Sequence, residues 1–105
     1  GPAADVHLDS PEVLAWEIGP EEAVDRFLLE GRTDLDLAAL RAWSKPRLPI
    51  GGGDLIAMGL EAGPVVARTM QAVEREWVRA GFPPDKAAVR AIARRHVDQA
   101  LRDKA

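Results

Sequence analysis

The residues best suited to acid–base or metal chemistry in this chain are its two histidines and its neighbouring carboxylates. His7 stands in the N-terminal segment, and His96 falls on the apolar side of a predicted helix, where a structural role is favoured over a catalytic or ligand role. No second histidine, cysteine or carboxylate stands at metal-ligand spacing on the same helical face. The Glu21-Glu22 and Glu74/Glu76 neighbours point to different sides of a helix. The sequence therefore predicts no catalytic residue and no metal site.

A glycine-rich turn, Gly51-Gly52-Gly53-Asp54, has backbone N–H groups that could cradle a phosphate. It lacks the Gly-Lys-Ser/Thr ending of a P-loop and follows no predicted strand, so a tight turn capped by Asp54 is the favoured interpretation. The alternative is a sequence-independent contact to a nucleic-acid backbone, because two helices are predicted to start in succession, at Asp54 and at Gly63-Pro64. The basic residues predicted within reach of these starts are Lys45, Arg47 and Arg68.

The helix predicted after Gly63-Pro64 has two distinct faces. At about 100° per residue, its apolar side chains fall within one stripe roughly 60° wide: Val66, Met70, Val73 and Trp77. Three arginines fall within about 40° of each other on the opposite face: Arg68, Arg75 and Arg79. A basic face that has no packing duty is free to contact a polyanion.

Helical periodicity and helix-capping residues dominate the sequence, so the residues above are expected on helices or in the turns between them. Patterns typical of strands are nearly absent. The first helix is predicted from Ser10-Pro11 to Gly19, the second from Pro20 to Gly31, and the third, capped by Asp34 or Asp36, through Trp43 to a stop before Pro46. A short helix is predicted from Leu55 to about Met58, a long one from Gly63-Pro64 to Gly81, and a last one after Asp85.

These elements predict an all-α fold, a small bundle of about five to six helices with a Pro/Gly-rich turn in the middle. The residues predicted to form turns and caps in the second half are Gly53, Asp54, Gly59, Gly63 and Pro64. Trp16, Trp43 and Trp77 occur once per helix at apolar positions, so core anchoring is favoured over base stacking.

Composition agrees with one soluble domain. The chain has 105 residues, of which 47% are hydrophobic and 30% charged, and no cysteine. The absence of cysteine favours a reducing cytoplasm, and neither a membrane span nor a signal peptide is predicted. Residues 1–9 are predicted to be disordered or derived from a tag, since Gly1-Pro2 is typical of the dipeptide left after tag cleavage.

Charge divides the chain into an acidic helical half, 10–45, and a basic helical half, 46–105, within a single domain, 1–105. Residues 1–40 hold ten acids and two bases, a net charge of 2 − 10 = −8, whereas residues 41–105 hold twelve bases and seven acids, a net charge of 12 − 7 = +5. Any polyanionic partner is therefore expected on the second half. The alternative is two solvated surfaces that differ in charge without a function.

Residues 45–83 resemble the C-terminal region of bacterial CCA-adding enzymes and the related poly(A) polymerases. In that family a Pro-rich lead-in, a Gly-x-Asp-Leu step, a Gly-Leu-x-x-Gly-Pro step and a long helix recur in this order. The matching residues are Gly52, Asp54, Leu55, Gly59, Leu60, Gly63 and Pro64, and Trp77 with Gly81-Phe82 resembles the end of the long helix.

The resemblance implies a non-catalytic, tRNA-binding C-terminal domain of a cytoplasmic tRNA nucleotidyltransferase that positions tRNA for a separate head domain. The head would carry the paired aspartates and use magnesium with CTP and ATP, and no cofactor is expected in this chain. The implied partners are tRNA and the head and neck domains, with a homodimer as a further assembly and no membrane contact. The candidate RNA-binding residues are Lys45, Arg47, Arg68, Arg75 and Arg79.

Other functions stay open. A protein-interaction or scaffolding module would dock an apolar surface on a partner or on a second copy. An independent DNA binder would use the Gly-rich turn as a helix-hairpin-helix does, although the apolar, β-branched pattern of such hairpins is missing. A self-contained enzyme is the least favoured, because no convergent reactive groups are present.

Overall fold

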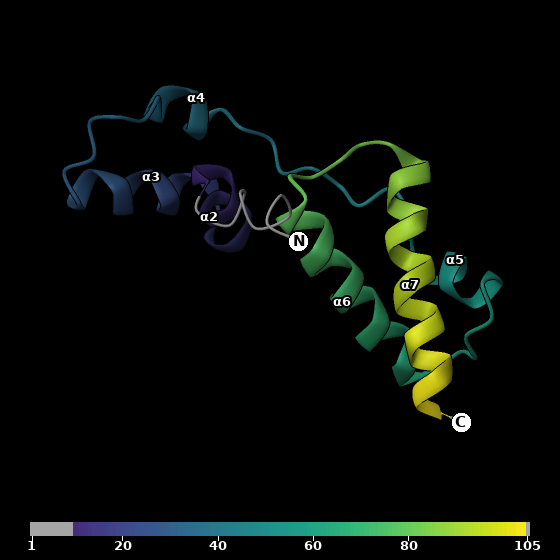
Figure 1. Cartoon of the computed structure of the whole chain (residues 1–105). Coiled ribbons are helices and arrows are strands. Elements are labelled where there is room, and N and C mark those ends of the chain that lie inside the picture. The colour runs from purple at the N-terminus through teal and green to yellow at the C-terminus, as the bar shows by residue number, and fades with distance from the viewer. Residues whose placement is uncertain (1–9, 105) are drawn as a thin grey trace.

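A computed structural model describes residues 10–104 of the chain and shows six α-helices and no strand in that range. The helices are α2 (Pro11–Ile18), α3 (Pro20–Leu29), α4 (Leu37–Arg41), α5 (Gly52–Ala57), α6 (Pro64–Arg79) and α7 (Lys86–Lys104) (Figure 1). The all-α prediction is confirmed. The prediction for residues 1–9 lies outside the described residues.

Prolines and capping side chains mark the ends of the helices, as the sequence predicts. Pro11, Pro20 and Pro64 each occupy the first turn of a helix, where a missing N–H costs nothing. Asp36, one of two candidate caps, begins α4 and accepts a hydrogen bond from the Ala39 N–H at 2.9 Å. Asp34 instead binds the Arg32 guanidinium at 2.8 Å. The paired carboxylate and the adjacent cap together fix the turn between α3 and α4.

The start of α5 corrects the sequence prediction. The helix begins at Gly52, so Gly53 lies inside α5 rather than in a turn, and Asp54 is in the first turn rather than at the N-cap. The Asp54 carboxylate reaches back and accepts a hydrogen bond from the Gly51 N–H at 2.8 Å, the role that an acidic side chain takes three residues after an N-cap. α4 also ends sooner than predicted, at Arg41, which leaves Trp43 in the following segment.

Gly59 and Gly63 adopt conformations that side chains disfavour, with φ of 123° and 146°. After α5, the Gly59 N–H bonds to the Ile56 carbonyl and the Leu60 N–H to the Leu55 carbonyl, a Schellman ending. Gly63 is the N-cap of α6 and Pro64 its first residue, as predicted. These two glycines make the tight connection that turns the chain from α5 into α6.

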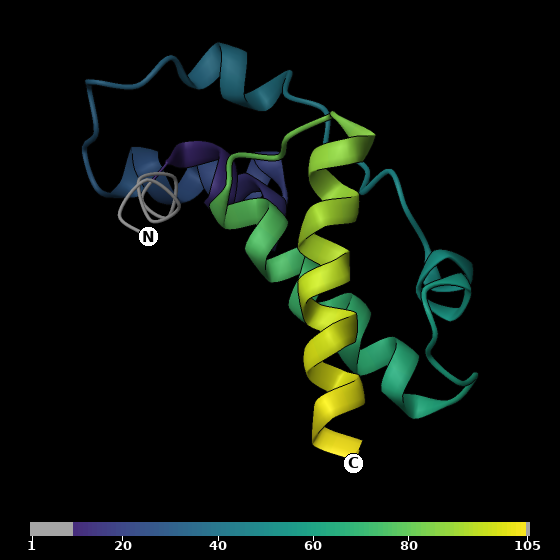
Figure 2. The same cartoon turned by 45° about the vertical axis from the view of Figure 1, so that its right-hand side comes forward.

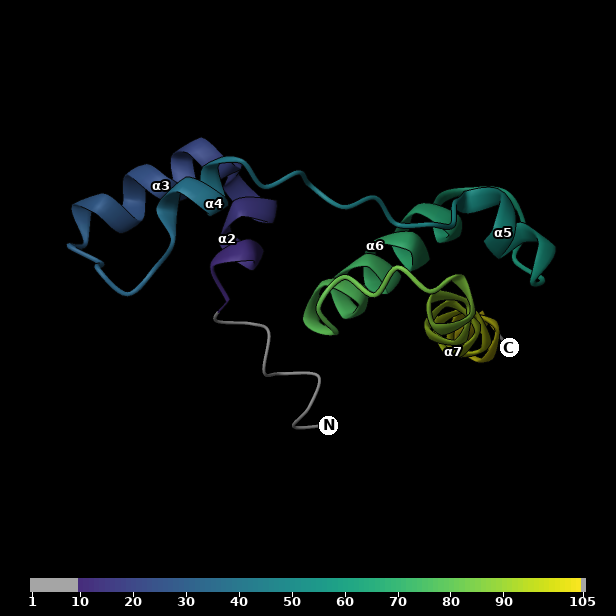
Figure 3. The same cartoon turned by 90° about the horizontal axis from the view of Figure 1, so that it is seen from above.

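The core consists of two clusters. One lies mainly among α5, α6 and α7 and includes Leu55, Val73, Trp77 and Val97, and Val13 of α2 is buried in it as well; the other lies among α2, α3 and α4 and includes Val24, Phe27 and Leu40. The molecule measures 51 × 26 × 22 Å, with a radius of gyration of 16.2 Å, larger than the roughly 13 Å of a compact chain of this length. Figure 3 shows the two lobes side by side, joined by the extended segment between α4 and α5.

Phe82 joins the lobes through the three tryptophans. Its ring centroid lies 6.5 Å from that of Trp16, 5.8 Å from that of Trp43 and 5.3 Å from that of Trp77. Trp77 is 1% exposed and donates its indole N–H to the Pro83 carbonyl at 2.8 Å, while Trp16 and Trp43 are half-buried. The tryptophans therefore anchor the core, as predicted, and leave no open row of rings for base stacking.

Candidate nucleic-acid interface

α6 packs through one face and leaves the other in solvent. Val73 and Trp77 are buried in the core, and Val66 and Met70 are half-buried against it. α7 crosses alongside α6, and α5 lies near the beginning of α6 (Figure 2). Because these elements cover its apolar sides, α6 has one polar face left, the face that carries three arginines.

Arg68, Arg75 and Arg79 form what we term the arginine stripe. All three are exposed, and none makes an ion pair within residues 10–104. The stripe extends over roughly 16 Å of α6, from its second turn to its last. Its guanidinium groups are thus available to an external anion.

Several basic residues elsewhere are already engaged. Arg94 lies 3.6 Å from Asp98, Lys104 lies 3.3 Å from Glu61, and Arg95 pairs with Glu76. Arg102 donates to the Gln99 side chain at 2.8 Å. This contrast separates the stripe from the later turns of α7, where Arg94, Arg95 and Lys104 each pair with an acid, whereas Arg90 makes no ion pair within residues 10–104.

Lys45 and Arg47 are exposed, but the structure places Lys45 apart from the first turns of α6. The Lys45 ammonium lies 4.8 Å from the centroid of the Trp16 ring, a cation–π contact beside Phe82 and Trp77. Trp77 is nine residues, or roughly 14 Å, along α6 from Arg68. The predicted grouping of Lys45 and Arg68 around two helix starts is therefore not the observed arrangement.

Leu48 and Ile50, which follow Arg47 in the chain, pack in the core cluster that contains the apolar face of α6. Gly52, the first residue of α5, also lies close to this face, since a Cβ placed on it would lie 3.0 Å from Cγ1 of Val66. Val66 and Arg68 are two positions apart and point to roughly opposite sides of the helix. Of the five predicted RNA-binding residues, three form the arginine stripe on α6, and the other two, Lys45 and Arg47, stand in the segment between α4 and α5.

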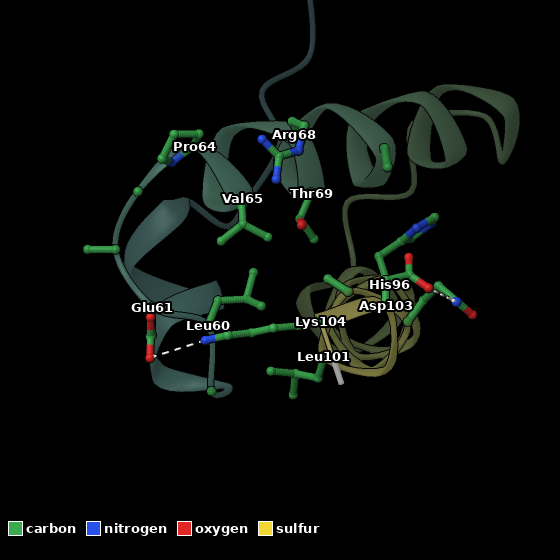
Figure 4. A pocket seen from close by; sticks show the side chains of 16 residues that line it. Leu60, Glu61, Pro64, Val65, Arg68, Thr69, His96, Leu101, Asp103 and Lys104 are labelled. Carbon is green, nitrogen blue, oxygen red and sulfur yellow. Dashed lines mark hydrogen bonds and ion pairs between the residues drawn. The ribbon is translucent and has the colours of Figure 1, made fainter.

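A groove that the sequence does not predict opens at the beginning of α6. The cavity has a volume of about 740 Å³ and lies between the α5–α6 connection, the first turns of α6 and the last turns of α7. Figure 4 shows Val65, Arg68 and Thr69 approaching it from α6, with Leu60 on one side and Leu101 on another. Its lining comes from segments about 40 residues apart in the chain, which no local periodicity could bring together. The one local signal is Thr69, a polar residue beside the apolar stripe of α6.

His96 and Glu76 connect α6 to α7. The His96 Nε2 lies 2.9 Å from the Glu76 Oε1, and Arg95 binds the same carboxylate. Partial burial raises the pKa of Glu76, but the hydrogen bonds from Arg95 and His96 outweigh burial and hold this pKa below its ordinary value. His96 has the interhelical, structural role that its place on an apolar face predicts.

The described residues, 10–104, contain no group of three His, Cys, Asp or Glu side chains that could hold a metal ion. No helix in this part of the chain is long and apolar enough to cross a membrane. Comparison with protein-family models, with curated proteins and with solved structures gave no match.

Proposed function

We propose that this chain is a non-catalytic, tRNA-binding domain of a CCA-adding tRNA nucleotidyltransferase and that it contacts the RNA backbone through the arginine stripe. The observation that carries the proposal is the stripe itself: exposed guanidinium groups without ion-pair partners among residues 10–104, on the solvent face of a helix whose other sides are packed. Arginine binds phosphate through a planar fork of donors, and such contacts do not depend on base sequence.

Two further features support this function. Residues 45–83 carry the Gly-x-Asp-Leu and Gly-Leu-x-x-Gly-Pro steps that resemble the tRNA nucleotidyltransferases, and in the structure these steps form α5, the Schellman turn and the start of α6. The motif thus builds the elements that hold the stripe in place. A folded RNA is recognised largely through its shape and backbone, because the deep major groove of A-form RNA is closed to side chains.

The chain's own residues do not fit a catalytic magnesium site, because within the described residues no carboxylate cluster converges. The proposal therefore assigns CTP, ATP and magnesium to a separate head domain, and to this chain the positioning of tRNA in the cytoplasm. The acidic lobe of α2 and α3 repels RNA and suits contacts with the head and neck.

The second candidate function is a protein-interaction module, and α3 favours it. Leu28 is 55% exposed and Leu29 is 90% exposed, so two large apolar side chains stand in solvent at the end of this helix. In that function the occupant is a second copy of the chain. The double variant Leu28→Gln, Leu29→Gln would then dissociate the dimer into monomers, as measured by analytical ultracentrifugation. The RNA-binding function does not require a dimer.

The experiment that separates the two is the affinity of the chain for a tRNA transcript, before and after the stripe is replaced by glutamine. RNA binding that weakens on replacement supports the proposal. Binding that is indifferent to replacement, with a dimer that depends on Leu28 and Leu29, supports the interaction module.

A further inference from the structure

The groove at the beginning of α6 contains a hydroxyl group without a partner among the described residues. Thr69 is the one buried polar side chain in this part of the chain, at 7% exposed, and it lines the groove. No hydrogen bond of its hydroxyl to another residue of 10–104 is present, although a threonine in a helix commonly bonds to the carbonyl four residues earlier. Figure 4 shows its side chain projecting from α6 into the space between α6 and α7.

A hydroxyl that has no partner in the protein can donate and accept hydrogen bonds with a ligand. The Thr69 oxygen keeps some accessible surface, since no fully enclosed side-chain oxygen or nitrogen without a partner occurs among the described residues. Because Thr69 lines the groove, a ligand bound there can reach this oxygen.

The start of α6 adds a site for an anion beside this hydroxyl. Gly63 has no side chain to cap the helix, Pro64 has no N–H, and the Val65 N–H finds no acceptor among the described residues. Arg68, one turn further on, lines the same groove. A 16-residue helix adds the positive end of its dipole at this point. An uncapped helix start next to an exposed arginine is suited to a phosphate.

The rest of the groove is apolar or already neutralised. Leu60, Val65 and Leu101 supply aliphatic surface between the helices. The two acids at the rim are occupied, since Glu61 lies 3.3 Å from Lys104 and Asp103 accepts from Gln99 at 2.8 Å. The volume of about 740 Å³ is in the range of roughly 300 to 1,000 Å³ that holds small organic ligands. The groove thus combines an aliphatic floor, one hydroxyl and a phosphate position.

We propose that the groove binds one unpaired nucleotide of the RNA, with the base on the aliphatic floor, its edge bonded to the Thr69 hydroxyl, and its phosphate between the start of α6 and Arg68. This inference rests on the proposed function, because Arg68 belongs to both the groove and the arginine stripe. An RNA strand whose phosphates contact the stripe would place the nucleotide beyond Arg68 at the groove. A hydroxyl both donates and accepts, so it can meet the edge of any base. Unpaired bases are also the part of RNA that side chains reach most readily.

The test compares an RNA stem-loop with a blunt RNA duplex that has the same number of phosphates. The native chain should bind the stem-loop more tightly than the duplex. Thr69→Val keeps the shape of the side chain and removes the hydroxyl, and it should weaken stem-loop binding about two- to ten-fold without affecting duplex binding or salt dependence. Thr33→Val, at an exposed position between α3 and α4, is the matched control and should change neither.

A second variant keeps the test valid if Thr69→Val alters the fold. Leu101 is exposed enough that Leu101→Gln removes aliphatic floor without opening the core, and it should reduce the preference for the stem-loop. Adenosine monophosphate alone tests whether the groove binds a free nucleotide instead of a nucleotide within RNA. If it binds as tightly as the stem-loop and Thr69→Val weakens both equally, the site serves a free nucleotide and the assignment to RNA is wrong.

The outcomes also separate this inference from the proposed function. Equal affinity for stem-loop and duplex, or a stem-loop preference that both variants leave intact, overturns the nucleotide groove while the stripe still binds RNA. Absence of binding to either RNA overturns both.

Discussion

Glu76 of α6 lies 2.9 Å from His96 of α7, measured from Oε1 to Nε2, and the same carboxylate binds Arg95. The last turn of α6 is thereby tied to the middle of α7. Since α6 carries the arginine stripe on its outer face, this connection holds the proposed RNA surface on the rest of the fold.

Glu76→Gln should destabilise the chain by about 0.5 to 1 kcal/mol, because it weakens bonds to two partners that are only partly shielded from water. The pKa of Glu76 is lowered by folding, so its contribution is fully present above the ordinary value of 4.5 and is lost as the pH falls through the lowered folded value. Urea unfolding of both forms from neutral to acidic pH should show a difference that shrinks on acidification. Glu74→Gln, on the same helix and without an ion pair among the described residues, is the control. A difference that grows on acidification would contradict the assignment.

Phe82→Ala should reduce stability by about 2 to 3 kcal/mol, since the ring contacts one tryptophan in each of three segments. The near-ultraviolet circular dichroism of the tryptophans should weaken at the same time, because the variant removes the aromatic part of the packing between the lobes and leaves Val13 of α2 in contact with the other cluster. Phe82→Leu keeps part of the apolar volume and should lose less. Unchanged melting temperature and spectrum would mean that the lobes are joined in another way.

Gly63→Ala should cost about 1 to 3 kcal/mol, because φ of 146° with ψ of −168° is a region that only glycine occupies readily. Gly53→Ala should instead stabilise the chain by about 0.5 to 1 kcal/mol, since Gly53 is helical, exposed and has open space where a Cβ would be placed. Thermal unfolding of both variants measures this opposite pair of signs. Melting temperatures that shift in the same direction for both variants would contradict a helical Gly53 together with a positive φ at Gly63.

Asp54→Ala should cost about 0.5 to 1 kcal/mol, because the Gly51 N–H would no longer have the carboxylate as its acceptor. Asp54→Asn keeps an acceptor oxygen and should recover part of that stability in the same unfolding experiment. Equal stability of the native and Ala forms would show that the carboxylate does not hold the start of α5.

The isolated chain should transfer no nucleotide from CTP or ATP to tRNA in the presence of magnesium, because no carboxylate group able to hold two metal ions exists among the described residues. A purified preparation that incorporates radiolabel above background, also after the stripe is replaced, would contradict the proposal that a separate head domain carries out catalysis.

Local sequence signals predict the helices well and their contacts poorly. Pro64 and Gly81 bound the longest apolar periodicity, and α6 follows it closely. The predicted start of α5 is wrong because an aspartate can stabilise a helix start from the N-cap position or from three residues after it. The sequence alone does not distinguish these two positions. The groove could not be predicted, because it arises where two helices diverge and where a connection folds across the gap.

The same limit applies to the basic residues. Helical periodicity predicts Arg68, Arg75 and Arg79 on one face, and all three are exposed in the structure while the apolar residues of α6 face the core. Lys45 and Arg47 stand in a segment without periodicity, so their proximity in sequence to Arg68 is the one guide to their position. In the structure Lys45 is held by the Trp16 ring instead.

The salt dependence of tRNA affinity decides whether the arginine stripe binds RNA. For the native chain and a variant in which Arg68, Arg75 and Arg79 are all Gln, the slope of log affinity against log salt should differ by roughly 0.7 to 0.9 for each phosphate that the variant no longer neutralises. A control with Arg26, Arg41 and Arg90 changed to Gln removes the same number of exposed charges from other helices. We expect a flatter slope and weaker binding for the stripe variant, a native slope for the control, and the same helicity in all three. Equal slopes for the stripe variant and the native chain would remove these arginines from the RNA interface.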